Sequence, residues 1–188
     1  TIALPSPAAG EVRIRHTAIG LNYIDTYHRS GLYALPLPSG IGLEAAGVVE
    51  DVGQGVTTLK AGDRVAYGTG APGAYSQARN YPTNRLIKLP DTIADETAAG
   101  MMLKGMTARY LLRATYVVKA GDTILMHAAA GGVGLILTQW AKALGARVIG
   151  TVGSAAKVEI AKQYGCDVVI NSSEEDVVKR VREETGGK

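Results

Sequence analysis

The first half of the chain carries short apolar and alternating apolar–polar stretches that are separated by glycines. Residues 11–17, 44–52 and 63–67 show this pattern, which is typical of half-buried strands. Two further strands are expected at 74–79 and 85–89. Several short strands at this spacing predict a small, mainly β barrel.

Near Asp91 the pattern changes from short strands to longer helices. Residues 94–114 are rich in Ala, Leu and Met, with acidic residues early and Arg late, which is the charge order that a helix favours. Farther along, strands alternate with helices, and the expected segments are in turn 123–127, 133–144, 147–151, 155–164, 167–170 and 174–184. This alternation predicts a doubly wound α/β fold with a parallel sheet and right-handed crossovers.

Two domains are therefore expected, residues 1–103 and residues 104–188. A complete doubly wound sheet has strand order 3-2-1-4-5-6, and this sequence supplies only the 3-2-1 half. The strand that would form the opposite wall of the ligand crevice is not among the 188 residues. We therefore expect the chain to be a truncated part of a longer one.

The most informative stretch is the glycine-rich turn at 129–134, Ala-Ala-Gly-Gly-Val-Gly, between an expected strand and an expected helix. Ala129 stands where the commonest dinucleotide fingerprint has its first Gly, and Gly131 and Gly134 hold the other two places. A turn without bulky side chains lets a pyrophosphate approach the backbone, where the N–H groups that begin the helix face the anion. The alternative is a tight turn that binds nothing. The residues expected to bind a dinucleotide are Ala130, Gly131, Gly132 and Val133.

The end of the second parallel strand indicates which dinucleotide binds. In enzymes that use NAD, an Asp or Glu about 20 residues after the motif accepts hydrogen bonds from the ribose 2′-OH. Here the strand end carries no carboxylate and offers Gly153, Ser154 and Lys157, which suit a 2′-phosphate. The sequence therefore favours NADPH over NADH. A solvated lysine in the first turn of a helix is the alternative explanation of Lys157.

Composition and charge argue against several other classes of partner. The net charge is +3, from 20 basic and 17 acidic residues that are interspersed, which argues against nucleic acid. No apolar run approaches the roughly 20 residues that span a bilayer, so no membrane partner is expected. A single cysteine, Cys166, excludes internal disulfides and fits a reducing compartment, so a cytoplasmic protein is expected.

Three segments resemble the zinc-independent quinone oxidoreductases, the zeta-crystallin-like family of the medium-chain dehydrogenase/reductase superfamily. They are residues 121–142, residues 20–33 and residues 103–110. The resemblance extends over nearly the whole chain. It implies an N-terminal GroES-like, mainly β catalytic domain, incomplete here, followed by the first half of a Rossmann domain. It also implies that the full-length protein is a homodimer.

The resemblance also supplies the remaining candidate site residues. Residues 22–30 are expected to form a short helix, and the resemblance places Asn22 and Tyr33 in the substrate pocket as the catalytic candidates. An Asn carboxamide can donate to or accept from the nicotinamide amide or a substrate oxygen. Tyr33 is the best candidate for a proton donor, with water as the alternative. The residues that the resemblance places against the coenzyme are Tyr23, Ile24, Asp25, Thr107 and Tyr110.

Some residues of this segment also have a structural explanation. Asp25 could bracket the short helix, and Tyr27 and Tyr33 could be packing residues. Around the 2′-phosphate, Gly153 and Lys157 match family positions, whereas Ser172 stands where related reductases often carry a Tyr.

No metal site is expected. Residues 42–56 resemble the zinc signature of the alcohol dehydrogenases, but Leu43 stands where those enzymes have a ligand His before the Glu. Catalytic zinc takes three protein ligands, and the three histidines are scattered along the chain. Glu44 is therefore expected to be structural, and the acceptor is expected to be one that takes hydride without a Lewis acid, a small-molecule quinone or an activated alkene.

The predicted function is an NADPH-dependent quinone reductase. Two alternatives stay open at this point. One is an NADPH-dependent enone or alkenal reductase of the same superfamily, which would use the same coenzyme site. The other is a non-enzymatic nucleotide- or RNA-binding protein of the zeta-crystallin type.

Overall fold

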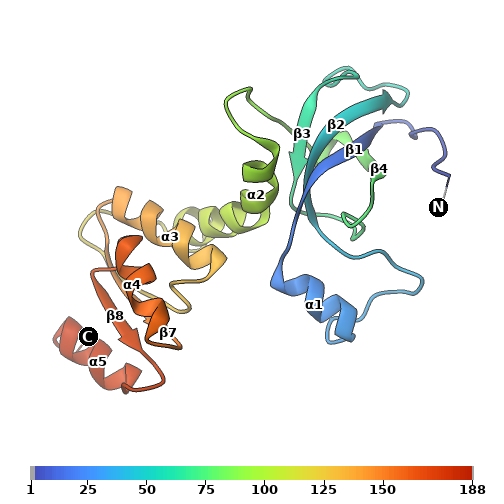
Figure 1. Ribbon diagram of the computed structural model, residues 1–188. Coiled ribbons are helices and arrows are strands. Elements are labelled where there is room, and N and C mark those ends of the chain that lie inside the picture. Colours follow the sequence, from blue (N-terminus) through green and yellow to red (C-terminus); the bar gives the residue numbers. More distant parts are fainter. Residues whose placement is uncertain (1–2, 188) are drawn as a thin grey trace. The chain divides into compact units, whose positions relative to one another are not determined.

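The computed structural model describes residues 3–187, and the chain consists of two compact units (Figure 1). The first unit runs to Leu103 and the second begins at Lys104. Among the described residues, no helix has both the length and the apolar character needed to cross a membrane.

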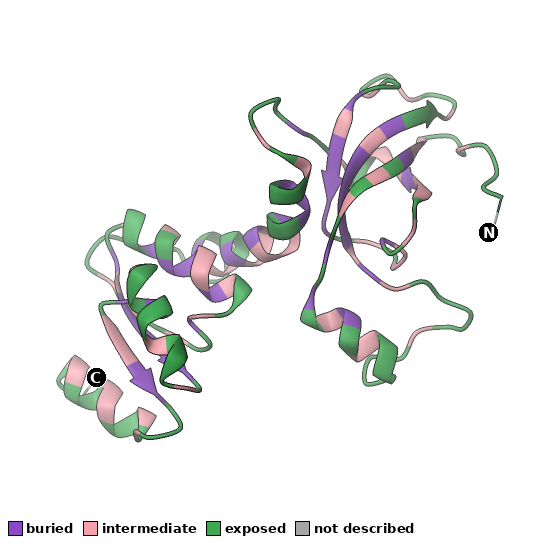
Figure 2. Ribbon diagram, viewed as in Figure 1, coloured by how far each residue is buried: buried purple, intermediate pink, exposed green. Residues whose placement is uncertain are grey.

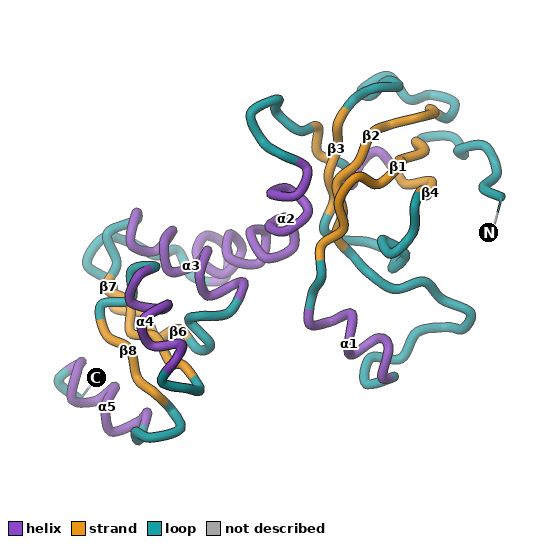
Figure 3. The backbone as a smooth tube through the Cα atoms, viewed as in Figure 1, coloured by secondary structure: helices purple, strands orange, loops and turns teal. Residues whose placement is uncertain are grey.

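The first unit is built on a five-stranded antiparallel sheet with strand order β4-β1-β2-β3-β5. Figure 3 labels β4, β1, β2 and β3 of this sheet. The strands are β1 (Glu11–Gly20), β2 (Glu44–Val52), β3 (Arg64–Tyr67), β4 (Ala78–Pro82) and β5 (Ile87–Lys88). Helix α1 (Tyr23–Ser30) follows β1, and the 3-10 turn η1 (Thr83–Arg85) precedes β5. The long β1–β2 pairing places Gly20 opposite Glu44, which brings the start of α1 close to the start of β2.

Tyrosines do much of the packing in the core of this unit, because the chain contains no Phe. Buried positions of this unit follow its central strands β1, β2 and β3 (Figure 2). Tyr67 and Tyr81 are both buried and stack with ring centroids 4.3 Å apart, and the Arg79 guanidinium lies 4.6 Å from the Tyr81 centroid. Their hydroxyls are satisfied inside the unit, since Tyr81 donates to the Thr69 carbonyl and Tyr67 lies 2.8 Å from His16 Nε2. The other buried members of this core are Val12, Ile14, Ala45, Val49, Val65 and Ala74.

The expected strand at 74–79 is wrong in its position, because β4 begins only at Ala78. Residues 74–77 form a turn instead, in which the Ser76 N–H donates to the Ala74 carbonyl and the Ser76 hydroxyl donates to the Gly73 carbonyl. Gly73 has a φ of 132°, which side-chain-bearing residues rarely adopt. The alternating pattern of 74–79 resembles a strand, but the hydrogen bonds of Ser76 turn the chain there.

The second unit has a three-stranded parallel sheet with order β6-β7-β8, which confirms the predicted half of a Rossmann fold. Its strands are β6 (Thr123–Met126), β7 (Arg147–Val152) and β8 (Val168–Asn171). The helices that follow them are α3 (Gly132–Ala143), α4 (Ala156–Gln163) and α5 (Val177–Thr185). Helix α2 (Asp95–Tyr110) contains the boundary between the units and continues as a π-helical turn, η2 (Leu111–Thr115).

The core of the second unit depends on small residues. A Cβ at Gly150 of β7 would lie 2.7 Å from the Ala129 Cβ and 2.6 Å from Cys166 Sγ. Cys166 is buried beside Thr138, and burial raises the pKa of its thiol. This cysteine is therefore a packing residue and a poor nucleophile.

The buried histidine of the first unit leads to a prediction about stability against pH. His16 Nδ1 lies 2.7 Å from the Ser76 carbonyl, so Nδ1 carries the proton and Nε2 accepts from Tyr67. Burial holds the pKa of His16 below its usual 6.5, and the Arg79 charge lowers it further against the opposing effect of the Ser76 hydrogen bond.

Because the unfolded chain then binds the proton more readily, the free energy of unfolding should fall as the pH drops through 6.5 and below. Denaturant melts between pH 8 and pH 5 should show this loss for the wild type and a flatter profile for His16→Gln. Parallel profiles for the two proteins would contradict the assignment.

Candidate functional site

The glycine turn at the carboxyl end of β6 is shaped by its backbone. Ala128 adopts a φ of 53°, and the Gly131 N–H donates to its carbonyl at 2.8 Å. The Ala129 N–H donates to the Thr151 carbonyl at 2.9 Å, which ties the turn to the end of β7. Helix α3 begins directly afterwards with Gly131 as its N-cap, and no side chain caps its first N–H groups. These N–H groups lie at the carboxyl edge of a parallel sheet, where doubly wound folds bind anionic ligands.

Small residues let α3 and β7 approach this turn closely. A Cβ at Gly134 would lie 2.5 Å from the Ala128 carbonyl oxygen and 2.6 Å from that of Ala129. Ala129 itself is buried and stands where the commonest fingerprint has a glycine. Its methyl group fits because Gly150 on β7 has no side chain. The departure from the fingerprint is thus compensated by a glycine on the neighbouring strand.

The residues that directly follow β7 in the sequence, 153–158, are neutral or basic. Gly153 and Lys157 are exposed, and Ser154 is partly buried, with its carbonyl accepting from the Lys157 N–H at 3.1 Å. Glu159, the nearest carboxylate farther along, is exposed and pairs with Lys162 at 3.0 Å. The described segment directly after β7 therefore has no carboxylate at the sequence position where NAD enzymes use one.

Two contacts at the sheet edge could not be seen in the sequence. Ser172, at the end of β8, donates to the Val152 carbonyl from both its N–H, at 2.8 Å, and its hydroxyl, at 3.0 Å. His127 Nδ1 lies 3.1 Å from the Thr151 hydroxyl. Both contacts join the ends of neighbouring strands. Only the observed strand register, such as Val152 opposite Asn171, identifies these partners.

Thr107 and Tyr110 lie three residues apart on α2 and so share a face of that helix. Tyr110 is half exposed, whereas Ala108 and Leu112 are buried in the core of the second unit. The two predicted coenzyme residues therefore stand on a different face from the residues that pack.

In the first unit, the predicted site residues cluster at the start of α1. Asn22 is the N-cap, and its N–H donates to Asp25 Oδ2 at 2.9 Å. The same oxygen accepts from the Tyr75 hydroxyl at 3.0 Å, and burial together with the Asp25 carboxylate raises the pKa of Tyr75 to about 12. Asp25 thus brackets the first turn of α1, and this residue is only 3% exposed. Ile24, between these residues, is partly buried.

The fully buried Glu44 connects this cluster to the sheet. Its Oε2 accepts from Asn22 Nδ2 at 2.5 Å, and its Oε1 accepts from the Leu103 N–H at 2.8 Å. A Cβ at Gly20 would lie 2.4 Å from Oε2, so only glycine leaves room for the carboxylate. The structural role expected for Glu44 is confirmed by its burial and its partners.

Three tyrosines form an aromatic surface on α1 and the loop after it. The ring centroids of Tyr23 and Tyr27 are 5.4 Å apart, and those of Tyr27 and Tyr33 are 5.2 Å apart, both edge to face. Tyr23 is 76% exposed and Tyr33 is 52% exposed. Their packing on Tyr27 leaves ring surface open to a planar ligand.

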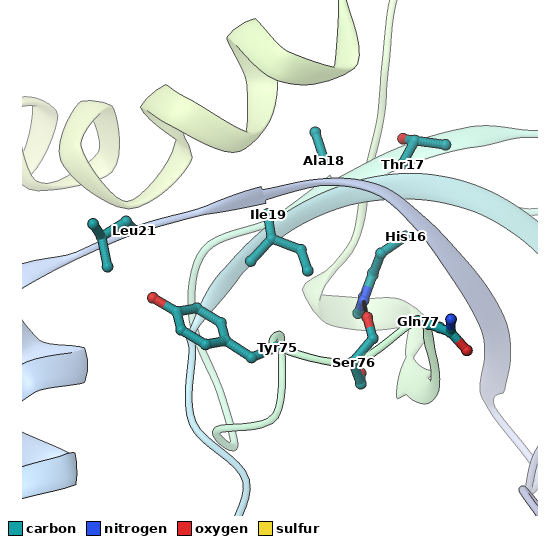
Figure 4. Close-up of a pocket in the computed structure, with 8 residues that line it drawn as sticks. All are labelled: His16, Thr17, Ala18, Ile19, Leu21, Tyr75, Ser76 and Gln77. Atoms are coloured by element: carbon teal, nitrogen blue, oxygen red, sulfur yellow. Dashed lines mark hydrogen bonds between the residues drawn. The ribbon is translucent and has the colours of Figure 1, made fainter. Parts of the chain in front are cut away.

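The described residues of this unit border at least two hollows. One, of about 720 Å³, is bordered by β1 and the 75–77 turn; Figure 4 shows Leu21 and Tyr75 toward one end of it and His16, Ser76 and Gln77 toward the other. The second, of about 420 Å³, is lined by the end of α1, including His28 and Arg29, and by the loop after it. Among residues 3–187, no group of three or more His, Cys, Asp and Glu side chains is arranged to hold a metal ion.

Gly134 gives a direct test of the turn geometry. Gly134→Ala should lower the free energy of unfolding by about 1–3 kcal/mol, because backbone carbonyls at 2.5–2.6 Å cannot easily move away from a new methyl group. Gly153→Ala is the matched control, since a Cβ there meets nothing within 4 Å, and its stability should stay within about 0.5 kcal/mol of wild type. Urea melts of the three proteins measure the difference, and equal stability of both variants would refute the close approach.

A mainly β unit followed by a parallel sheet with a glycine turn defines the class of medium-chain dehydrogenases and reductases. Comparison with known families agrees. Residues 8–122 match the model of the alcohol dehydrogenase GroES-like domain, and residues 132–188 match that of the zinc-binding dehydrogenases.

Individual relatives narrow the assignment. The chain is 57% identical over 183 residues to a quinone oxidoreductase of Pseudomonas aeruginosa, in an alignment that covers 97% of this chain and 56% of the relative. It is 52% identical over 194 aligned positions to a 2-haloacrylate reductase of a Burkholderia species, covering 100% of this chain and 58% of the relative. The crystal structure of Escherichia coli quinone oxidoreductase complexed with NADPH superposes with a TM-score of 0.97 at 54% identity, covering 100% of this chain and 58% of that one.

The chain belongs to the quinone oxidoreductase family of the medium-chain dehydrogenase/reductase superfamily. It spans a little more than half the length of the curated relatives that it matches.

Proposed function

We propose that this protein transfers hydride from NADPH to a quinone, without zinc. The observation that carries the proposal is the uncapped, glycine-lined start of α3 beside a β7 end that lacks a carboxylate. The E. coli relative of known structure was crystallised with NADPH, which supports the choice of coenzyme. Relatives named quinone oxidoreductase support the choice of acceptor.

In the proposed reaction, the residues of the protein bind the coenzyme and orient the two reacting rings. NADPH supplies the hydride, which is the difficult chemical step. Residues 130–133 hold the pyrophosphate with backbone N–H groups, and the 2′-phosphate is held by Gly153, Ser154 and Lys157. By family resemblance, the nicotinamide half of the coenzyme contacts Tyr23, Ile24, Asp25, Thr107 and Tyr110. The hydride acceptor contacts Asn22 and Tyr33. Orientation of the two rings in a water-poor site is the protein's main contribution to the rate.

The proposal of zinc-free chemistry rests on the surroundings of Glu44. Leu43 precedes it and offers no metal ligand, and both oxygens of Glu44 accept hydrogen bonds from Asn22 and Leu103. A quinone takes hydride without a Lewis acid, and the quinol oxygen then takes a proton from water or from the half-exposed Tyr33.

A second candidate acceptor is an activated alkene. The Burkholderia relative, which is 52% identical, is named a 2-haloacrylate reductase, and a haloacrylate is an alkene activated by a carboxylate. The same coenzyme site would serve both acceptors. A turnover assay against both classes therefore decides between them.

We further propose that the full-length protein is a homodimer of the cytoplasm. The family resemblance supports the dimer. The single, buried Cys166 fits a reducing compartment.

Lys157 provides the test of coenzyme choice. Lys157→Ala should weaken NADPH binding roughly tenfold, because it removes a charge-assisted hydrogen bond to the 2′-phosphate, and should leave NADH binding unchanged. Titration with each dinucleotide, followed by nicotinamide fluorescence, measures both affinities. Lys162→Ala on the same helix is the control and should bind both as wild type does. Equal losses for NADPH and NADH in Lys157→Ala would remove this lysine from the site.

Turnover provides the test of the reaction. NADPH oxidation by the purified full-length protein should proceed with 1,4-benzoquinone and stay undiminished after dialysis against a strong chelator. Tyr33→Phe should lower kcat if Tyr33 delivers the proton, and should leave kcat unchanged if water does. Activity that disappears with the chelator and returns with Zn²⁺ would overturn the zinc-free proposal. Turnover of 2-haloacrylate but not of quinone would favour the second candidate.

A further inference from the structure

The hollow of about 420 Å³ at the end of α1 contains side chains that the proposed reaction does not use. Two of them, His28 and Arg29, belong to the last turn of α1. The loop that follows lines the hollow with apolar residues, among them Leu35, Leu37 and Ile41. A hollow of this size lies within the range in which small molecules bind. It therefore combines a cationic group with an apolar wall.

The charge around this hollow is of one sign. Residues 26–43 contain no Asp or Glu. Arg29 is exposed, and among the described residues no carboxylate forms an ion pair with its guanidinium. The neighbouring imidazole of His28 has a buried Nδ1 that no group of residues 3–187 hydrogen-bonds. The charge of Arg29 is therefore not offset by the described part of the chain, and it favours an anionic ligand.

Capping of the helix does not account for Arg29. A basic residue in the last turn of a helix can bond to carbonyls that the helix leaves open. Here the Tyr27 carbonyl accepts from the Tyr33 N–H at 3.3 Å. The His28 carbonyl accepts from the Gly31 N–H, also at 3.3 Å. Both carbonyls thus have partners without the guanidinium, which stays available to another acceptor.

Backbone hydrogen bonds and prolines hold the walls of the hollow. Gly31 ends α1 with a φ of 77°, a conformation that suits glycine. At the other wall, the Ile41 carbonyl accepts from the Tyr75 N–H at 3.1 Å. The loop between them contains Pro36 and Pro38, each of which fixes its own φ. A hollow that is shaped before binding loses less conformational entropy when a ligand enters.

We propose that this hollow binds a small organic acid, with the carboxylate at Arg29 and the apolar part against Leu35 and Ile41. A planar guanidinium matches a carboxylate through two parallel hydrogen bonds. A monoanion fits better than a phosphate dianion, because one guanidinium supplies one fixed positive charge. The inference goes beyond the proposed function, since the binding requires no coenzyme.

Hexanoate and its neutral isostere hexanamide test the role of the charge. Calorimetric titration of the full-length protein should show that hexanoate binds roughly tenfold more tightly, as expected for one charge-assisted hydrogen bond. Arg29→Gln should abolish that preference. Arg85→Gln is the matched control and should keep it, since Arg85 is also exposed in this unit and does not line the hollow. A preference that survives in Arg29→Gln would overturn the proposal.

The series acetate, butyrate and hexanoate tests the apolar wall. Affinity should rise about two- to fourfold with each added methylene, because each one leaves water for the wall. Leu35→Ala should flatten this dependence and leave the preference for hexanoate over hexanamide in place. Equal affinities for the three acids would mean that Arg29 attracts an adventitious ion only, which would refute the site.

Histidine NMR signals test where the acid binds. The imidazole signals of His28, identified by their loss in His28→Gln, should shift when hexanoate is added. Those of His16 should stay in place, since His16 lines the other hollow, of about 720 Å³. Shifts of His16 without shifts of His28 would assign the acid to that other hollow and contradict the proposal.

Two sources can supply the carboxylate, a separate acid or the hydride acceptor itself. The rings of His28 and Tyr33 are 6.5 Å apart, so the hollow adjoins a residue that is proposed to contact the acceptor. Competition between bound hexanoate and 1,4-benzoquinone during NADPH oxidation would identify the acceptor as the source. Turnover that bound hexanoate leaves unchanged would identify a separate acid. A failure to bind NADPH would remove the proposed function and not this site, whereas a failure to bind hexanoate would remove only the site.

Discussion

The first unit depends on how it accommodates the carboxylate of Glu44. A carboxylate removed from water is costly unless donors surround it, and two of its donors come from distant parts of the chain, Asn22 and Leu103. Those hydrogen bonds connect the start of α1, the start of β2 and the middle of α2. Gly20 follows from the same constraint, since a side chain there would occupy the carboxylate's place. The positions of Asn22 and Gly20 in this unit are therefore linked to the burial of one carboxyl group.

The second unit is organised by close packing instead of buried charge. Its glycine turn has the shape that an anion requires only because α3 and β7 approach it without side chains at Gly134 and Gly150. Ala129 shows that the close packing of the turn depends on residues of the neighbouring strand as well. The fingerprint position accepts a methyl group because the space that it needs is left open on the neighbouring strand. In this chain the glycine at 150 thus offsets the glycine that is missing at 129, and the turn stays intact.

The sequence predicted the parallel sheet and its helices well because strand, turn and helix are each marked by local patterns, as at 123–144. It misplaced the strand at 74–79, where alternation suggested pairing but the hydrogen bonds of Ser76 produce a turn. Candidate residues such as Asn22 and Lys157 could be named from motifs and resemblance. Their partners could not, because the contact between Asn22 and Glu44 depends on the β1–β2 register, and that of Ser172 with Val152 depends on the β7–β8 register. Register is a tertiary property, and it determines which side chains meet.

In such a site, the choice between NADPH and NADH depends more on the absence of a carboxylate at the end of β7 than on the presence of Lys157. Lys157 is exposed, and an exposed charge contributes modestly because water and salt screen it. A carboxylate at the end of β7 would have the larger effect, since it would hydrogen-bond a ribose 2′-OH and repel a 2′-phosphate. The β7 end has no such carboxylate, and the hydroxyl of Ser172 is turned inward to the Val152 carbonyl. In the proposed function, the site therefore tolerates the 2′-phosphate because no carboxylate of this segment repels it, and Lys157 adds attraction. It follows that introducing an acidic residue at Gly153 would shift the coenzyme preference further than removing the lysine would.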